Sequence, residues 1–243
     1  MRGGSSRGER GRAFVLALLG VLALGTGVAF AGVEPMTFTV VAEDDDAFVA
    51  DPTIQESAIL RFQNNDNVTH NVTATGTGPD DKALFRSENL AGVDTPPGDV
   101  VNVNGTQFLG IGTYDFLCTI HPNMEGTLTI NDFPGGSPVP RPEIDVKVKS
   151  KKLEKVVKSG KLKVKVSAAG PTDADDVLLT AKKGAKGITK RARLNVNAGD
   201  SKTAKLKLKK KAAEKLAKLD KAKVKVQGTV DFGFGDKASK KLK

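Results

Sequence analysis

Between residues 36 and 131, apolar and polar residues alternate in short runs that are separated by Gly, Asn, Asp and Pro. A period of two places successive side chains on opposite faces of a strand, and short strands with turn residues between them are typical of an all-β sandwich. The predicted strands are residues 37–41, 58–63, 70–74, 99–103, 113–118 and 126–130. Residues 78–95 have no clear period, and we expect a loop with a short helical turn there.

The second half of the chain alternates apolar residues with lysine, which predicts strands with one buried and one cationic face. The segments with this pattern are residues 144–149, 162–166, 206–208 and 224–226. Residues 210–219 have helical spacing, so we predict an immunoglobulin-like β-sandwich with one short helical crossover over residues 143–243. Residues 133–142 are rich in Pro and Gly and predict a stiff linker after a first domain at 32–132.

Charge separates the two halves. Residues 32–140 hold three basic and sixteen acidic residues, a net charge of −13, whereas residues 141–243 hold thirty-one basic and eleven acidic residues, a net charge of +20. The basic half has no Tyr, Trp or His, and its only aromatic residues are Phe232 and Phe234, so it lacks the stacking platforms of nucleic-acid-binding proteins. We therefore expect no nucleic acid, and instead an anionic cell-wall polymer or membrane surface as its partner. Docking onto the acidic half of the same or another chain is the alternative.

The N-terminus has the pattern of an export signal. An arginine-bearing stretch ends at Arg12, an apolar run follows over residues 13–24, and small residues lead to Ala29-Phe30-Ala31. We expect cleavage after Ala31, so that residues 1–31 are a signal peptide and the remainder lies in the cell envelope, the periplasm or outside the cell. The alternative is an uncleaved anchor over residues 13–31, which approach the length of about 20 residues that spans a bilayer.

Metal-binding residue types gather in one short stretch. Cys118, His121 and Met124 fall within seven residues at the end of a predicted strand, and His70 precedes them at the start of another. Two imidazoles and a thiolate with a weak axial thioether are the donor set of an electron-transfer copper site. The soft sulfur ligands suit Cu(I) and the imidazoles also bind Cu(II).

Simpler readings of these residues are a structural His and a buried Cys. The chain nevertheless contains one Cys and two His in total, and all three fall in this pattern. A structural zinc site would need further thiolate ligands, and haem attachment needs two cysteines. Because Cys118 is the only cysteine, no intramolecular disulfide can form. We expect Phe116, Leu117 and Ile120 to keep water from the metal.

The stretch Cys118-x-x-His121-x-x-Met124, with Pro122 after the His, resembles the ligand loop of the cupredoxin (type 1 blue copper protein) family. Its short spacing is similar to that of amicyanins, whereas plastocyanins have a longer gap between His and Met. The resemblance covers about residues 35–131.

This resemblance implies a cupredoxin Greek-key β-sandwich and one type 1 copper ion per chain, with His70, Cys118, His121 and Met124 as ligands. It also implies that Asn71 holds the Cys loop by hydrogen bonding, and that His121 lies near the surface on the path of the electron. The residues that would surround His121 on the docking face are not apparent in the sequence.

The resemblance implies an electron carrier that passes single electrons between redox protein partners and has no catalytic residues. Four protein ligands leave no coordination position for a substrate, which disfavours a small copper oxidase or reductase. Copper storage or delivery is the third possibility.

Two weaker patterns carry less weight. Asn67, Asn71 and Asn104 each begin an N-x-Thr glycosylation pattern, which often occurs by chance, and we expect all three in turns or strands. The acidic run at residues 43–46 lacks the spaced ligands of a calcium loop, so we expect a solvated turn.

Overall fold

The computed structural model describes residues 39–43 and 47–243. The predicted export signal at residues 1–31 and three of the four residues of the acidic run lie outside the described residues. In the described part, no helix is long and apolar enough to cross a membrane.

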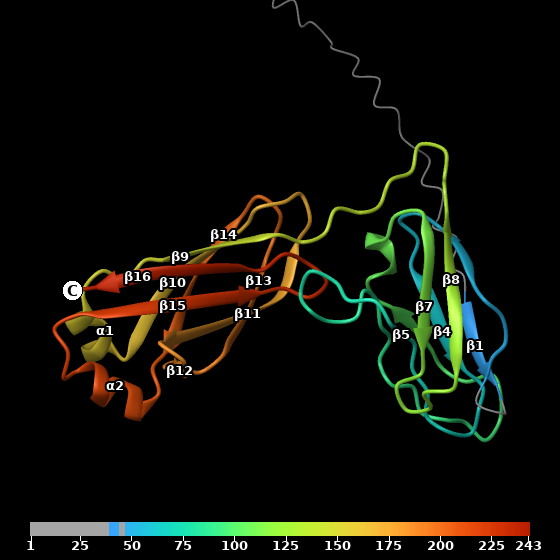
Figure 1. The fold of residues 1–243 in the computed structure, drawn as a ribbon, viewed down its shortest axis with the longest axis horizontal. Coiled ribbons are helices and arrows are strands. Elements are labelled where there is room, and N and C mark those ends of the chain that lie inside the picture. The colour runs from blue at the N-terminus through green and yellow to red at the C-terminus, as the bar shows by residue number, and fades with distance from the viewer. Residues whose placement is uncertain (1–38, 44–46) are drawn as a thin grey trace, which may run out of the picture. The chain divides into compact units, whose positions relative to one another are not determined.

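Residues 39–131 form two sheets of four strands each (Figure 1). The first sheet has the order β2-β1-β4-β6, with β1 parallel to β4, and the second has the order β3-β8-β7-β5, with β3 parallel to β8. The strands are β1 (Thr39–Glu43), β2 (Ala47–Phe48), β3 (Thr53–Gln55), β4 (Leu60–Asn64), β5 (Thr73–Ala74), β6 (Val100–Val103), β7 (Gly112–Leu117) and β8 (Glu125–Asn131), with a 3-10 helix at Thr106–Phe108. The two-sheet, all-β architecture predicted for this part is confirmed.

The alternating residues of both sheets meet in one hydrophobic core. Phe62 from the first sheet and Phe116 and Leu128 from the second are at most 1% exposed. Phe48 packs edge-on against Phe116, with 5.0 Å between ring centroids. This core buries the apolar face of β7, the strand that leads into the candidate metal ligands.

Two predictions for this part need correction. Of the strand predicted at residues 70–74, only Thr73–Ala74 forms regular strand, and residues 78–95 contain a hydrogen-bonded turn at Gly78–Asp81 but no helix. Residues 83–90 instead run beside residues 70–76, with the amides of Leu84 and Leu90 bonded to the carbonyls of Gly76 and His70 at 2.9 Å. The helical prediction was wrong because these irregular bridges between residues distant in sequence satisfy the backbone.

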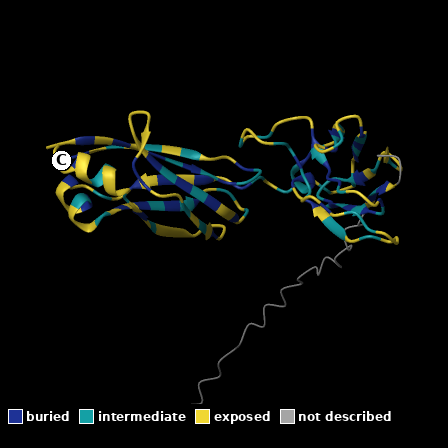
Figure 2. Ribbon diagram, turned by 90° about the horizontal axis from the view of Figure 1, so that it is seen from below, coloured by how far each residue is buried: buried dark blue, intermediate teal, exposed yellow. Residues whose placement is uncertain are grey.

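The second half forms another pair of sheets, of order β14-β10-β9 and β12-β11-β15-β16, with β13 paired to β11. Their strands are β9 (Ile144–Val148), β10 (Lys161–Ala168), β11 (Ala174–Lys183), β12 (Lys186–Gly187), β13 (Ala192–Val196), β14 (Ser201–Lys207), β15 (Ala222–Thr229) and β16 (Asp236–Leu242). Figure 2 shows buried and exposed residues alternating along these strands, as the apolar–lysine pattern predicts.

Both sheets of the second half contribute to its core, for example through Leu162, Leu179 and Val224, which are at most 1% exposed. One helix was predicted and two are present, α1 (Leu153–Ser159) and α2 (Lys210–Leu216). α2 is the predicted helix, within residues 210–219, and α1 was not predicted. Residues 132–142 contain no strand or helix, as a linker would, but the domain boundaries at 132 and 143 stay a prediction.

Candidate metal centre

Three of the four predicted ligands lie in the loop between β7 and β8. These strands pair antiparallel up to Leu117 opposite Glu125, so the loop starts and ends at adjacent points of one sheet. The amide of Cys118 donates to the carbonyl of Met124, and the amide of Met124 donates to the carbonyl of His121, both at 2.9 Å. The loop is therefore a closed turn that holds its side chains on one side of the sheet end.

His70 reaches this loop from a neighbouring segment. β5 pairs with β7, with Thr73 opposite Leu117, which places residues 70–72 beside the loop. The backbone of His70 is fixed by two hydrogen bonds to Leu90, of 3.1 and 2.9 Å. Thus the imidazole comes from irregular but fully hydrogen-bonded backbone.

The potential ligand atoms of His70, Cys118 and His121 converge on one point. The Cys118 Sγ lies 3.7 Å from His70 Nδ1 and 3.9 Å from His121 Nδ1, and the two nitrogens are 3.1 Å apart. Metal bonds to N and S of about 2.0–2.3 Å, arranged in a trigonal plane, require separations of about 3.5–3.7 Å between donors. The three residues therefore fit a single transition-metal ion at their centre with small adjustments.

Burial around the three donors is uneven. His70 and Cys118 are fully buried, and Met124 is 2% exposed and belongs to the same hydrophobic core as Cys118. His121 is half-buried. Of these side chains, His121 is the only one that is not buried.

The three residues predicted to keep water from the metal differ in burial, and the prediction is wrong for Ile120. Phe116 is 1% exposed and Leu117 is half-buried, but Ile120 is 42% exposed. Ile120 lies in the closed turn outside the strand alternation, so its side chain is not directed into the core.

Asp66 holds the ring of His70 in place. The Asp66 Oδ2 lies 2.9 Å from His70 Nε2, and both side chains are buried. Because a carboxylate can only accept, Nε2 donates to Asp66, and Nδ1 is the ring nitrogen that faces Cys118. Burial by itself would raise the pKa of Asp66, but hydrogen bonds from His70 and the backbone of Asn67 outweigh it, so the pKa lies below its ordinary value.

Asn71 holds the residue after Cys118. Its Oδ1 accepts a 3.0 Å hydrogen bond from the amide of Thr119, and its Nδ2 donates to Thr119 Oγ1 and Asn89 Oδ1, both at 2.8 Å. These contacts are the ones expected of a residue that holds the Cys loop. Asn71 is 3% exposed, and both the oxygen and the nitrogen of its side-chain amide are hydrogen-bonded. The amide nitrogen is therefore not accessible for the attachment of a glycan.

Sequence reasoning missed Asp66 and a second buried polar residue, Asn64. Asn64 is fully buried, and its Nδ2 lies 2.8 Å from the carbonyl of Val68 and 3.0 Å from that of Leu90. Asn64 therefore links the residues that precede His70 to Leu90, whose backbone is bonded to that of His70. In the sequence, both residues belong to a polar run that has the composition of a solvated turn, so nothing in the pattern indicated that they are buried.

No family model matches the chain, and no curated protein does. Among solved structures, an amicyanin from Paracoccus versutus is 26% identical, with 42% of this chain and 87% of that chain covered and a TM-score of 0.31. A purple cupredoxin from Nitrosopumilus maritimus is 20% identical, with 39% and 99% covered and a TM-score of 0.31. An oxidised amicyanin mutant is 19% identical, with 39% and 82% covered and a TM-score of 0.32. TM-scores this low carry no argument about function.

Proposed function

We propose that this protein is an exported type 1 (blue) copper protein that carries single electrons between redox partners. One copper ion per chain is held by His70, Cys118, His121 and Met124. The observation that carries the proposal is the convergence of two imidazole nitrogens and one cysteine sulfur, 3.1–3.9 Å apart, at a loop that buried Met124 closes by accepting the backbone hydrogen bond of Cys118. This combination of two imidazoles, one thiolate and a thioether is the donor set of electron-transfer copper sites.

The chemistry that bound copper supplies is a one-electron couple between Cu(I) and Cu(II). The chain's own residues limit how far the ligands can move when the charge changes. Asp66 fixes the ring of His70, Asn71 fixes the backbone at Thr119, and the hydrogen bond from Cys118 to Met124 closes the loop. Ligands held in this way change position little on oxidation, which favours fast electron transfer.

The accessible edge of His121 is the route that we propose for the electron. His70, Cys118 and Met124 are shielded by the core, whereas His121 is half-buried and reaches the surface. Four protein ligands leave no coordination position for a substrate, which argues for a carrier rather than an enzyme. Export rests on the signal pattern at residues 1–31.

Absorption spectroscopy tests this proposal. Addition of Cu(II) to the purified chain should produce an intense visible thiolate-to-copper band, which bleaches with ascorbate and returns on reoxidation. The variant Cys118→Ser should lack the band, whereas Thr119→Ser, which keeps the neighbouring hydroxyl, should retain it.

Other outcomes of this experiment separate the alternatives. A band that persists in Cys118→Ser would refute the copper site. Stoichiometric copper binding without reversible bleaching would indicate copper storage or delivery. Catalytic consumption of oxygen with a reductant would indicate a small copper oxidoreductase.

A further inference from the structure

Lysines lie directly opposite one another on the sheet β14-β10-β9. The opposed pairs are Lys161 with Lys207, Lys163 with Lys205, and Lys165 with Lys147. Directly opposed side chains on antiparallel strands lie about 4.5–5.5 Å apart at Cβ, and like charges in these positions repel each other. Solubility does not require this placement, because lysines spread over the surface would serve equally well. The pairs therefore form a concentrated positive surface.

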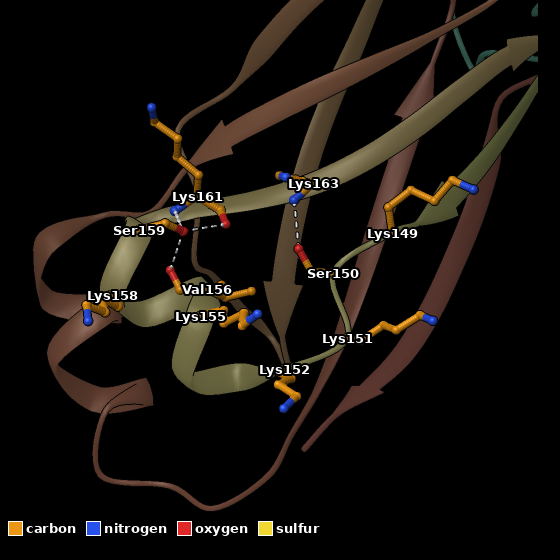
Figure 3. Close-up of a pocket in the computed structure, with 10 residues that line it drawn as sticks. All are labelled: Lys149, Ser150, Lys151, Lys152, Lys155, Val156, Lys158, Ser159, Lys161 and Lys163. Carbon is orange, nitrogen blue, oxygen red and sulfur yellow. Dashed lines mark hydrogen bonds between the residues drawn. The ribbon is translucent and has the colours of Figure 1, made fainter.

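This surface continues into a hollow of about 580 Å³ beside α1 and the start of β10. Ten residues line the hollow, and seven of them are lysines (Figure 3). Lys161 and Lys163 belong both to the opposed pairs and to the lining, and α1 adds Lys155 and Lys158. The lysines of the sheet and the lysines of α1 thus lie around the same hollow.

No ion pair in the described part of the chain engages the lysines of the hollow, although Glu154 and Asp220 lie near Lys152 and Lys158 on the far side of α1. The lining contains neither Asp nor Glu. Ser150 and Ser159 accept hydrogen bonds from the backbone amides of Lys163 and Lys161 rather than from their ammonium groups (Figure 3). All seven lysines are exposed, so their charges face solvent.

The surroundings of the hollow indicate the kind of anion that it fits. The large apolar side chains exposed in the described residues are Val49, Val68, Ile111, Ile120, Leu219 and Phe234, and none of them lies on β9, β10, β14 or α1. The surface therefore has no apolar wedge for a bilayer and no aromatic ring for a nucleobase. Charges on one face of a strand recur about every 6.6–6.8 Å, a spacing that suits a chain with an anionic group in each short repeat.

We infer that the lysine-lined hollow and the adjoining rows of β10 and β14 bind a flexible, linear polymer of phosphate groups that carries no nucleobases. The contact is electrostatic, and each bound phosphate displaces counterions from the polymer. Binding of the polymer does not require copper. Failure of this inference would therefore leave the proposed electron-carrier function unaffected, and failure of that function would leave this inference unaffected.

Two variants with the same change in charge test this inference in the full chain. The hollow variant is K155Q/K158Q/K161Q/K163Q. The control variant is K182Q/K223Q/K225Q/K241Q, which removes four exposed lysines from opposed pairs on the other sheet. Thermal unfolding checks that both variants fold. The probe is fluorescently labelled inorganic polyphosphate, and its affinity is measured by fluorescence anisotropy over a series of NaCl concentrations.

We expect the hollow variant to bind polyphosphate roughly 100-fold more weakly than wild type at low salt, and the control variant to bind it less than about threefold more weakly. The slope of log Kd against log salt should fall by about 0.7 for each phosphate that the protein no longer neutralises, and only in the hollow variant. Equal weakening in both variants would mean that net charge alone attracts the polymer, and would overturn the inference. Tighter binding of phosphatidylglycerol vesicles, or of an oligothymidylate with the same number of phosphates, would overturn it as well.

Discussion

Replacement of Asp66 by Asn removes the carboxylate behind His70 while keeping the size of the side chain. The carboxylate accepts two hydrogen bonds in the buried site, from His70 Nε2 at 2.9 Å and from the amide of Asn67 at 2.5 Å. Asp66 is 4% exposed, so water cannot replace these hydrogen bonds. A neutral amide accepts more weakly than a carboxylate, and it no longer requires the proton of His70 to lie on Nε2.

Two magnitudes follow from these hydrogen bonds. Loss of the group that orients a metal-ligating His lowers metal affinity by about 10- to 100-fold, or about 1.4–2.7 kcal/mol. Hydrogen bonds to a charged group contribute about 1 kcal/mol more than neutral ones, so two weakened bonds should destabilise the metal-free chain by about 1–2 kcal/mol. The reduction potential should rise, because the carboxylate favours the more highly charged Cu(II).

The assay is a competition titration of Cu(II) against a chelator, followed at the visible band, together with urea unfolding of the metal-free chain. Asp173→Asn is the matched control, because this exposed carboxylate in the second half also accepts an amide hydrogen bond, from Ala198 at 2.7 Å. The control should keep wild-type copper affinity. If Asp66→Asn binds copper within about threefold of wild type and its potential is unchanged, the reasoning about His70 is refuted.

Two further substitutions probe the loop and the strand pair that supports it. Met124→Leu should raise the reduction potential, because loss of the axial thioether disfavours Cu(II), and should weaken copper binding only slightly; voltammetry beside the chelator titration separates the two effects. An unchanged potential would exclude Met124 as a ligand. Gly126→Ala should destabilise the chain by about 1–3 kcal/mol in urea unfolding, because the new Cβ would lie 2.5 Å from Phe116 Cζ. Gly110→Ala is its control, since its nearest neighbour would be Pro138 Cγ at 3.8 Å.

Strands were predictable where apolar and polar residues alternate clearly. β4, β7 and β8 in the first half and β10 and β15 in the second bury alternate residues, and their ends were predicted to within a few residues. β11, although it has ten residues, was not predicted, because the run Val177-Leu178-Leu179 interrupts the alternation. β2 and β3 have two and three residues, which cannot display a period of two.

The candidate ligands were identifiable because Cys, His and Met are rare in this chain, so their spacing stands out. The residues that position them are common polar types, and their role depends on burial. Asp66 and Asn64 lie in a run that looks solvated in the sequence, yet both are at least 96% buried. The contact that buries them comes from Leu90 and its neighbours, whose pairing with residues 70–76 is not apparent in the pattern of the chain.

The opposed lysines of β10 and β14 have a consequence for how the second half responds to its medium. Repulsion between fixed like charges is greatest in dilute buffer and is screened as ions are added, over a distance of about 10 Å at 0.1 M salt. A domain stabilised by surface ion pairs loses stability as ionic strength rises, whereas the second half of this chain should gain stability. The folded state of the second half is thus most stable in a medium rich in salt or polyanions. There, counterions screen the rows of lysines that strand pairing places next to each other.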